Sequence, residues 1–98
     1  MPDFSLRAIL NVLLAQKEIL SRKYHVSKIG VFGSVARGDF TTNSDVDLLV
    51  EFDAPVGLEF VSLALFLEAL LGRKVDLISK RGLRPKYLKL IEQEVVYA

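Results

Sequence analysis

Two acidic residues at the start of an apolar run constrain this sequence most. Asp45 and Asp47 are separated by Val46, and the run continues to Phe52 with residues typical of a buried β-strand. Side chains two positions apart on a strand point to the same face, so both carboxylates would lie together. At about 6–7 Å, two such charges repel by about 2–3 kcal/mol at an effective dielectric constant of about 20. A divalent cation would offset this repulsion, which predicts a metal site on this strand.

Asp76 is a third acidic residue inside an apolar segment, over residues 74–79. If the two strands are neighbours, their spacing of about 4.8 Å brings Asp76 next to the acidic pair. Three carboxylates around two metal ions suit in-line phosphoryl or nucleotidyl transfer, and Mg²⁺ binds carboxylates together with substrate phosphates. Each feature alone has an ordinary explanation. Residues 44–47 could form a turn, a helix cap or a calcium loop, and Asp76 could be a surface residue at a strand end.

A glycine–serine turn precedes the acidic pair. Gly33 and Ser34 follow an apolar strand expected over 26–32 and precede a short helical turn over 34–37. Backbone N–H groups at such a turn can bind phosphate oxygens, and glycine permits their close approach. An ordinary loop can have the same sequence. The prediction of a phosphate site therefore depends on the turn and the acidic residues occurring together.

The order of elements predicts an α/β (α+β) fold: a single mixed sheet of three to four strands with helices packed on it. The chain of 98 residues is expected to form one domain, over 1–98. The remaining expected elements are an amphipathic helix over 5–23 with Asp3 or Ser5 as its cap, helices over 58–71 and from Pro85 to 92 or 93, and a short terminal strand over 94–97.

Charge and composition exclude several classes of protein. The net charge of +1 gives no general basis for nucleic-acid binding, so direct binding of nucleic acid is not expected. The absence of cysteine excludes disulfides, thiolate metal sites and a cysteine nucleophile. The longest apolar stretch, 58–71, is shorter than the about 20 residues of a membrane span, and the N-terminus lacks a signal-peptide pattern. We therefore expect a cytoplasmic protein that does not bind membranes.

The expected helix over 58–71 is apolar around most of its circumference. A helix that packs only on a sheet needs one apolar stripe, so this helix is expected to be covered on a second side. Two covers are possible: another protein chain, or the C-terminal helix of this chain.

These motifs resemble those of the minimal nucleotidyltransferases, within the DNA polymerase beta-like nucleotidyltransferase superfamily. The shared pattern is Gly33-Ser34, a ten-residue spacer, Asp45-Val46-Asp47 and a distant single acid, Asp76. The fuller motifs over 33–38 and 44–48 agree, as does the ending over 91–97. The resemblance therefore covers nearly the whole chain, and it implies the polymerase beta-like nucleotidyltransferase fold.

The resemblance also implies roles for the acidic residues in catalysis. Asp45 and Asp47 would bind both of two Mg²⁺ ions. Asp76 would bind the catalytic ion and help to activate the acceptor hydroxyl.

For the substrate, the resemblance implies that Gly33 and Ser34 hold the nucleoside triphosphate. Arg37 could contact phosphate or the acceptor. It could equally be a surface arginine that pairs with Asp39 or another acid.

The implied reaction transfers AMP from ATP to an acceptor and releases pyrophosphate. Small members of this family are commonly antitoxins encoded beside HEPN-domain ribonuclease toxins, and some AMPylate a tyrosine of that toxin. The chain would then be a protein adenylyltransferase and antitoxin, in a hetero-oligomer with a HEPN toxin. Two alternatives stay open: an antitoxin that neutralises its partner by complex formation alone, and a nucleotidyltransferase with a small-molecule acceptor.

Overall fold

A four-stranded mixed sheet with the strand order β3-β2-β1-β4 forms the centre of the computed structural model, which describes residues 4–98. β1 is antiparallel to β2 and to β4, whereas β2 and β3 are parallel. The predicted mixed α/β sheet is therefore confirmed, and its last strand is shorter than expected. The strands are β1 Val26–Phe32, β2 Val46–Phe52, β3 Val75–Ser79 and β4 Val96–Tyr97.

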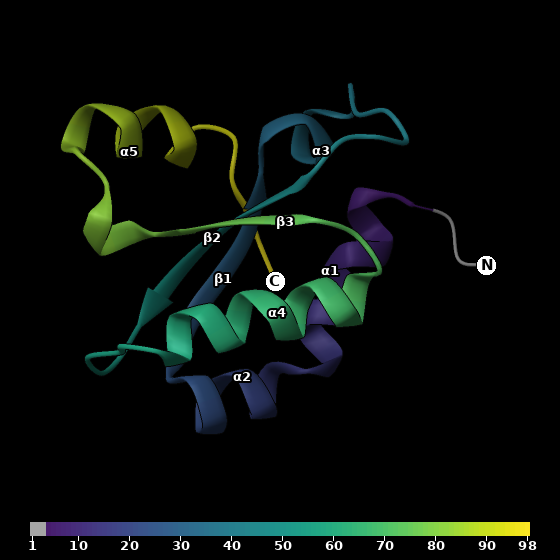
Figure 1. The fold of residues 1–98 in the computed structure, drawn as a ribbon. Coiled ribbons are helices and arrows are strands. Elements are labelled where there is room, and N and C mark those ends of the chain that lie inside the picture. Colours follow the sequence, from purple (N-terminus) through teal and green to yellow (C-terminus); the bar gives the residue numbers. More distant parts are fainter. Residues whose placement is uncertain (1–3) are drawn as a thin grey trace.

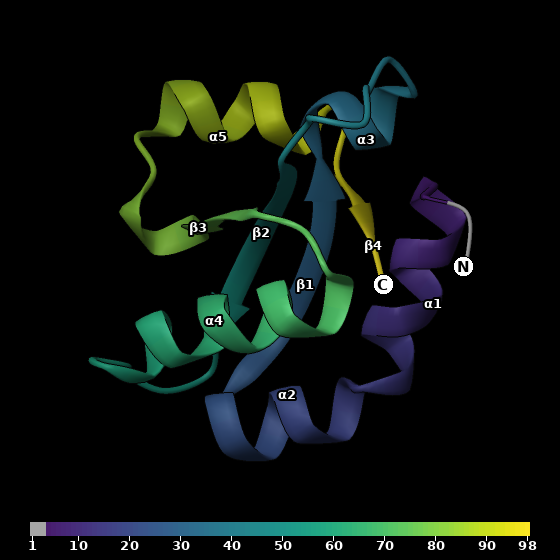
Figure 2. The ribbon, with the colours of Figure 1, turned by 45° about the vertical axis from the view of Figure 1, so that its right-hand side comes forward.

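The helices lie on both sides of this sheet. Figures 1 and 2 show α1, α2 and α4 on one side and α5 on the other, with α3 at the end of β1. The helices are α1 Leu6–Ala15, α2 Lys17–Tyr24, α3 Gly33–Arg37, α4 Glu59–Leu71 and α5 Pro85–Glu92, and a 3₁₀ turn, η1, spans Lys80–Gly82.

The single helix expected over 5–23 is wrong, because α1 and α2 are separate helices that meet at Gln16. Gln16 has φ −101° and ψ 11°, and its N–H donates to the carbonyl of Leu13 in a tighter turn. Figure 2 shows α1 and α2 running in different directions. The expected cap at Ser5 is confirmed, since its hydroxyl accepts from the N–H of Ala8 at 3.1 Å. Asp3, the other candidate cap, lies outside the described residues.

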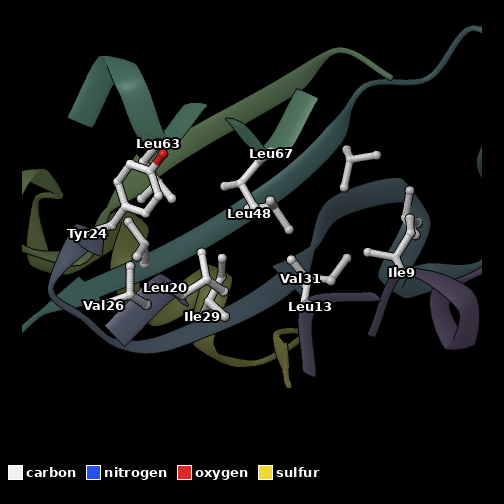
Figure 3. Packing of buried hydrophobic residues seen from close by; sticks show 13 residues of the cluster. Ile9, Leu13, Leu20, Tyr24, Val26, Ile29, Val31, Leu48, Leu63 and Leu67 are labelled. Atoms are coloured by element: carbon white, nitrogen blue, oxygen red, sulfur yellow. The ribbon is translucent and has the colours of Figure 1, made fainter. Parts of the chain in front are cut away.

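The hydrophobic core lies between the sheet and α1, α2 and α4. Figure 3 shows Leu67 of α4 beside Leu48 of β2, and Leu63 beside Tyr24 of α2. Leu48, Leu63 and Leu67 are completely buried. Burying such side chains contributes about 1.5–3 kcal/mol each, so this interface holds the strands that carry the acidic residues.

Truncating a side chain of α4 is expected to destabilise the protein strongly on the buried face of the helix and hardly at all on its exposed face. Leu63→Ala should lower the free energy of unfolding by about 2–5 kcal/mol, because Leu63 is fully buried and a cavity would remain. Leu65→Ala, on the same helix, should change it by less than about 0.5 kcal/mol, because Leu65 is 62% exposed. Urea unfolding of both variants measures the difference. Equal effects of the two changes would contradict this packing.

The second side of α4 is only partly covered. Tyr24 of α2 stacks on Phe66 of α4 with ring centroids 5.4 Å apart. The C-terminal helix does not cover α4, because α5 lies across the sheet (Figure 1), so this one of the two possible covers is wrong. Leu58, Val61 and Leu65 stay exposed along the outer side of α4. Within residues 4–98, no helix combines the length and apolar character that a membrane span requires.

Candidate active site

Asp47 and Asp76 are direct neighbours in the sheet. They occupy paired positions of the parallel strands β2 and β3. Adjacent strands lie about 4.7–4.9 Å apart, so the side chains of such a pair stand close together on one face. Asp47 is half-buried, whereas Asp76 is exposed. The expected proximity of the third acid to this strand is therefore confirmed for Asp47.

Asp45 differs from its expected position. β2 begins at Val46, one residue later than predicted, so Asp45 stands before the strand and is exposed. The strand start is fixed by the N–H of Val46, which donates to the carbonyl of Lys74 at 2.9 Å. Asp45 lines a hollow between α1, the 42–45 loop and the end of α4. Asp47 lines a different cleft.

The carboxylate of Asp47 is electrostatically unfavourable in its ionised form. Its pKa is raised to about 6, first because the group is partly buried and then because Asp76 and Asp45 carry negative charge nearby. The cation of Arg37 opposes this rise, and the carboxylate of Glu94 adds to it. Protonation relieves this penalty, and so would a bound cation.

The acidic residues fit a divalent cation in chemical type. Carboxylate oxygens are the ligands that Mg²⁺ prefers. The pKa of Asp47 is raised first by burial and then by repulsion from Asp76 and Asp45, and a bound cation would offset both effects. As the side chains stand in the described chain, no three His, Cys, Asp or Glu groups converge to hold a metal ion. Binding would thus require Asp45, outside the strand, to turn toward the pair of Asp47 and Asp76.

Gly33 lies directly against the carboxylate of Asp47. The antiparallel pairing of β1 and β2 places Phe32 opposite Asp47, and the chain then turns at Gly33 with φ +72°. A Cβ atom at Gly33 would overlap with Oδ2 of Asp47. Only glycine therefore permits both this backbone angle and this close approach.

Arg37 and Glu94 complete the cleft beside Gly33. The Gly33 N–H donates to Oε1 of Glu94 at 2.8 Å, and Nη1 of Arg37 donates to both Glu94 oxygens at 3.3 and 3.2 Å. Nε of Arg37 donates to Asp39 at 3.2 Å. Hydrogen bonds to Asp39 and then Glu94 raise the pKa of Arg37. The alternative in which Arg37 pairs with Asp39 or another acid is the arrangement seen here.

An open cleft of about 770 Å³ brings several predicted residues together: it is lined by Gly33, Ser34, Arg37 and Asp47, with Glu94. Sequence reasoning missed Glu94. It lies 61 residues from Gly33 along the chain, and no local pattern marks it as part of this site.

Comparison with known proteins gives the class to which this fold belongs. A family model described as the nucleotidyltransferase domain matches residues 14–98. The protein adenylyltransferase MntA of Thermococcus cleftensis is 44% identical over 98 residues, covering 99% of each chain. A solved structure assigned as a minimal nucleotidyltransferase superposes with a TM-score of 0.82 at 34% identity, covering 98% of each chain.

A third likeness concerns the fold alone. The structure of a tri-AMPylated HEPN toxin of Shewanella oneidensis in complex with its MNT antitoxin matches with a TM-score of 0.61 at 20% identity. The match covers 88% of this chain and 70% of that chain.

The fold is that of a nucleotidyltransferase. Within that class, this chain belongs to the minimal nucleotidyltransferase family, and the resemblance seen in its motifs is confirmed.

Proposed function

We propose that this protein transfers AMP from ATP to a hydroxyl group of a partner protein, a tyrosine of a HEPN-domain toxin, and thereby acts as its antitoxin. Two findings support the proposal. The relative that is 44% identical is named a protein adenylyltransferase. The fold is shared with the MNT antitoxin complexed with an AMPylated HEPN toxin.

The observation that carries the proposal is the contact of the Gly33 turn with Asp47, beside Asp76. A nucleotidyl transfer needs donors for the triphosphate next to acidic groups that can hold a cation. Here the Gly33 N–H and the Ser34 hydroxyl would bind phosphate oxygens. Asp45, Asp47 and Asp76 would hold two Mg²⁺ ions, which supply neutralising charge for the phosphates.

The reaction balances without any further reactant. The oxygen of the acceptor hydroxyl forms a bond to the α-phosphorus of ATP, and the bond from that phosphorus to the α–β bridging oxygen breaks. Pyrophosphate leaves, and the hydroxyl loses its proton. Asp76 is exposed, so it can meet an acceptor from another chain and help to take that proton. Asp47 is half-buried, so it is better placed than Asp76 to hold the cation that binds the nucleotide.

Transfer of label from ATP tests this function. The purified protein is incubated with Mg²⁺, the proposed HEPN-domain partner, and ATP labelled on either the α- or the γ-phosphate. We expect label on the HEPN protein from α-labelled ATP only, with release of pyrophosphate, and loss of labelling in an Asp45→Asn, Asp47→Asn double variant. Equal labelling by that variant would refute the assigned roles. Label from the γ-phosphate would indicate a kinase instead.

Neutralisation by binding alone is the second candidate, and the exposed side of α4 favours it. Leu58, Val61 and Leu65 form an apolar strip on the surface, and such strips commonly mark protein interfaces. The same double variant separates the two functions. Full neutralisation of the toxin by the inactive variant would favour binding, whereas complex formation without neutralisation would favour AMP transfer.

A further inference from the structure

The carboxylate of Glu94 occupies the Gly33 N–H, the same donor that the proposed function assigns to a phosphate oxygen of the nucleotide. Oε1 of Glu94 accepts from the Gly33 N–H at 2.8 Å, and both carboxylate oxygens accept from Arg37. This position therefore binds an anion already, and the anion belongs to the chain itself.

We propose that Glu94 and a phosphate group of the nucleotide compete for the Gly33 N–H and Arg37, so that the C-terminal segment 93–98 acts as an internal competitor of the nucleotide. The inference rests on the proposed function, because it assumes that the nucleotide uses Gly33.

The competition follows from the shared chemistry of the two anions. Carboxylate and phosphate oxygens accept charge-assisted hydrogen bonds from the same donors, namely backbone N–H groups and arginine. The Gly33 N–H has one hydrogen and lies 2.8 Å from Oε1 of Glu94, so a phosphate oxygen can take this donor only after the carboxylate leaves.

Like charges make joint occupancy unfavourable as well. Glu94 lines the same cleft as Asp47 and already raises the pKa of that group. A triphosphate entering this cleft would add negative charge beside both carboxylates. Removal of Glu94 from Gly33 relieves part of that repulsion, and it also frees the cation of Arg37 for the nucleotide.

The attachment of Glu94 to the fold allows such a displacement. It stands between the end of α5 and β4, a strand of two residues that pairs with β1 at Gly30 with Tyr97 and Val31 with Val96. The N–H of Ala98 adds one hydrogen bond to the carbonyl of Ile29. Figure 2 shows this connection passing close to α3 at the top of the sheet. Rotation of the Glu94 side chain, or a shift of this short connection, would open the N–H to a ligand.

The competition multiplies the intrinsic affinity for the nucleotide by the fraction of time that Gly33 is free, so the less often Gly33 is free, the weaker the apparent binding. Glu94→Gln keeps the size of the side chain and removes its charge. We expect this variant to bind an ATP analogue with an uncleavable α–β methylene bridge about five- to tenfold more tightly in Mg²⁺ buffer, as measured by calorimetry. Glu94→Asp, whose carboxylate is one methylene shorter, should also bind it more tightly and serves as the second variant.

Glu92→Gln is the matched control. It removes one negative charge two residues earlier, from a side chain that pairs with Lys80 at 3.6 Å. Its dissociation constant should stay within about twofold of the wild type, because Glu92 does not line the cleft that Glu94 shares with Gly33 and Arg37. Tightening by both Gln variants alike would show a general charge effect and overturn the inference, as would unchanged or weaker binding by Glu94→Gln.

A second readout separates this inference from the proposed function. In amide NMR spectra, the Gly33 resonance should move on Glu94→Gln substitution, and it should move again when the wild type is titrated with the analogue. Binding of the analogue with an unmoved Gly33 resonance overturns the inference alone. If neither the wild type nor Glu94→Gln binds the analogue, the proposed function is overturned, and the inference with it.

Discussion

Asp47→Asn is expected to abolish nucleotidyl transfer and to stabilise the protein in the presence of a metal chelator. Activity should fall by at least about a hundredfold, because preorganised charge at the reacting phosphates is lost. The pKa of Asp47 lies near 6 in the fold, against an ordinary value of 3.8, so its ionised form opposes folding. After allowance for partial exposure, removing that charge should raise the free energy of unfolding by about 1–2 kcal/mol at pH 7.5.

The gain in the free energy of unfolding of Asp47→Asn should depend on pH. A group whose pKa is raised by folding binds its proton more tightly in the folded state, so its contribution favours the fold at low pH and is lost as the pH rises through about 6. The advantage of Asp47→Asn over the wild type should therefore be largest above pH 6 and shrink toward pH 4. Denaturant unfolding at pH 7.5 and pH 4, both with chelator, measures it.

Asp53→Asn provides the control for a simple change of net charge. Asp53 is exposed in the loop after β2, away from the acidic pair, and its replacement should change stability by less than about 0.5 kcal/mol at either pH. An Asp47→Asn variant that is less stable than the wild type at pH 7.5 would contradict the unfavourable charge. Magnesium should narrow the gap between wild type and variant, because the cation stabilises only the protein that keeps the carboxylate.

The sheet was predictable because its strands are encoded locally. The runs over 26–32 and 46–52 are rich in β-branched and other apolar residues and are bounded by turn residues, and Asp76 lies inside a third such run. Alternation predicted that Asp45 and Asp47 share one face of a strand, but only Asp47 lies in β2. The pairing of Asp47 with Asp76 confirms the expected proximity of the third acid. The strand start, however, depends on a hydrogen bond from Val46 to Lys74, and no sequence pattern specifies it.

Features that depend on distant contacts were not predictable in the same way. The apolar spacing of α1 continues into α2, since Leu13 and Leu20 are both buried, so the pattern could not reveal the break at Gln16. The ion pair of Arg37 with Glu94 joins residues 57 positions apart. Its formation depends on the route of the chain from α5 to β4, which brings the carboxylate back to the Gly33 turn.

Gly33→Ala is expected to damage both the fold and the activity. The backbone has φ +72° at this position, which costs a residue with a Cβ about 1–2 kcal/mol. The new methyl group would also overlap with the carboxylate of Asp47, and such overpacking costs about 1–3 kcal/mol more. Because Asp47 must shift to make room, nucleotidyl transfer should fall by about a hundredfold. Urea unfolding and the labelling assay measure the two effects.

Gly38→Ala separates the backbone cost from the overlap. Gly38 also has a positive φ, +87°, but nothing lies within 4 Å of the position of its Cβ. Gly38→Ala should therefore lose only the stability that the positive φ costs, and it should keep most of its activity. In an Asp47→Ala background the overlapping carboxylate is gone, so the stability cost of Gly33→Ala should fall to about that of Gly38→Ala. If Gly33→Ala costs the same stability in both backgrounds, Gly33 is required for its backbone angle alone. The turn and the carboxylate of Asp47 would then not be in steric contact.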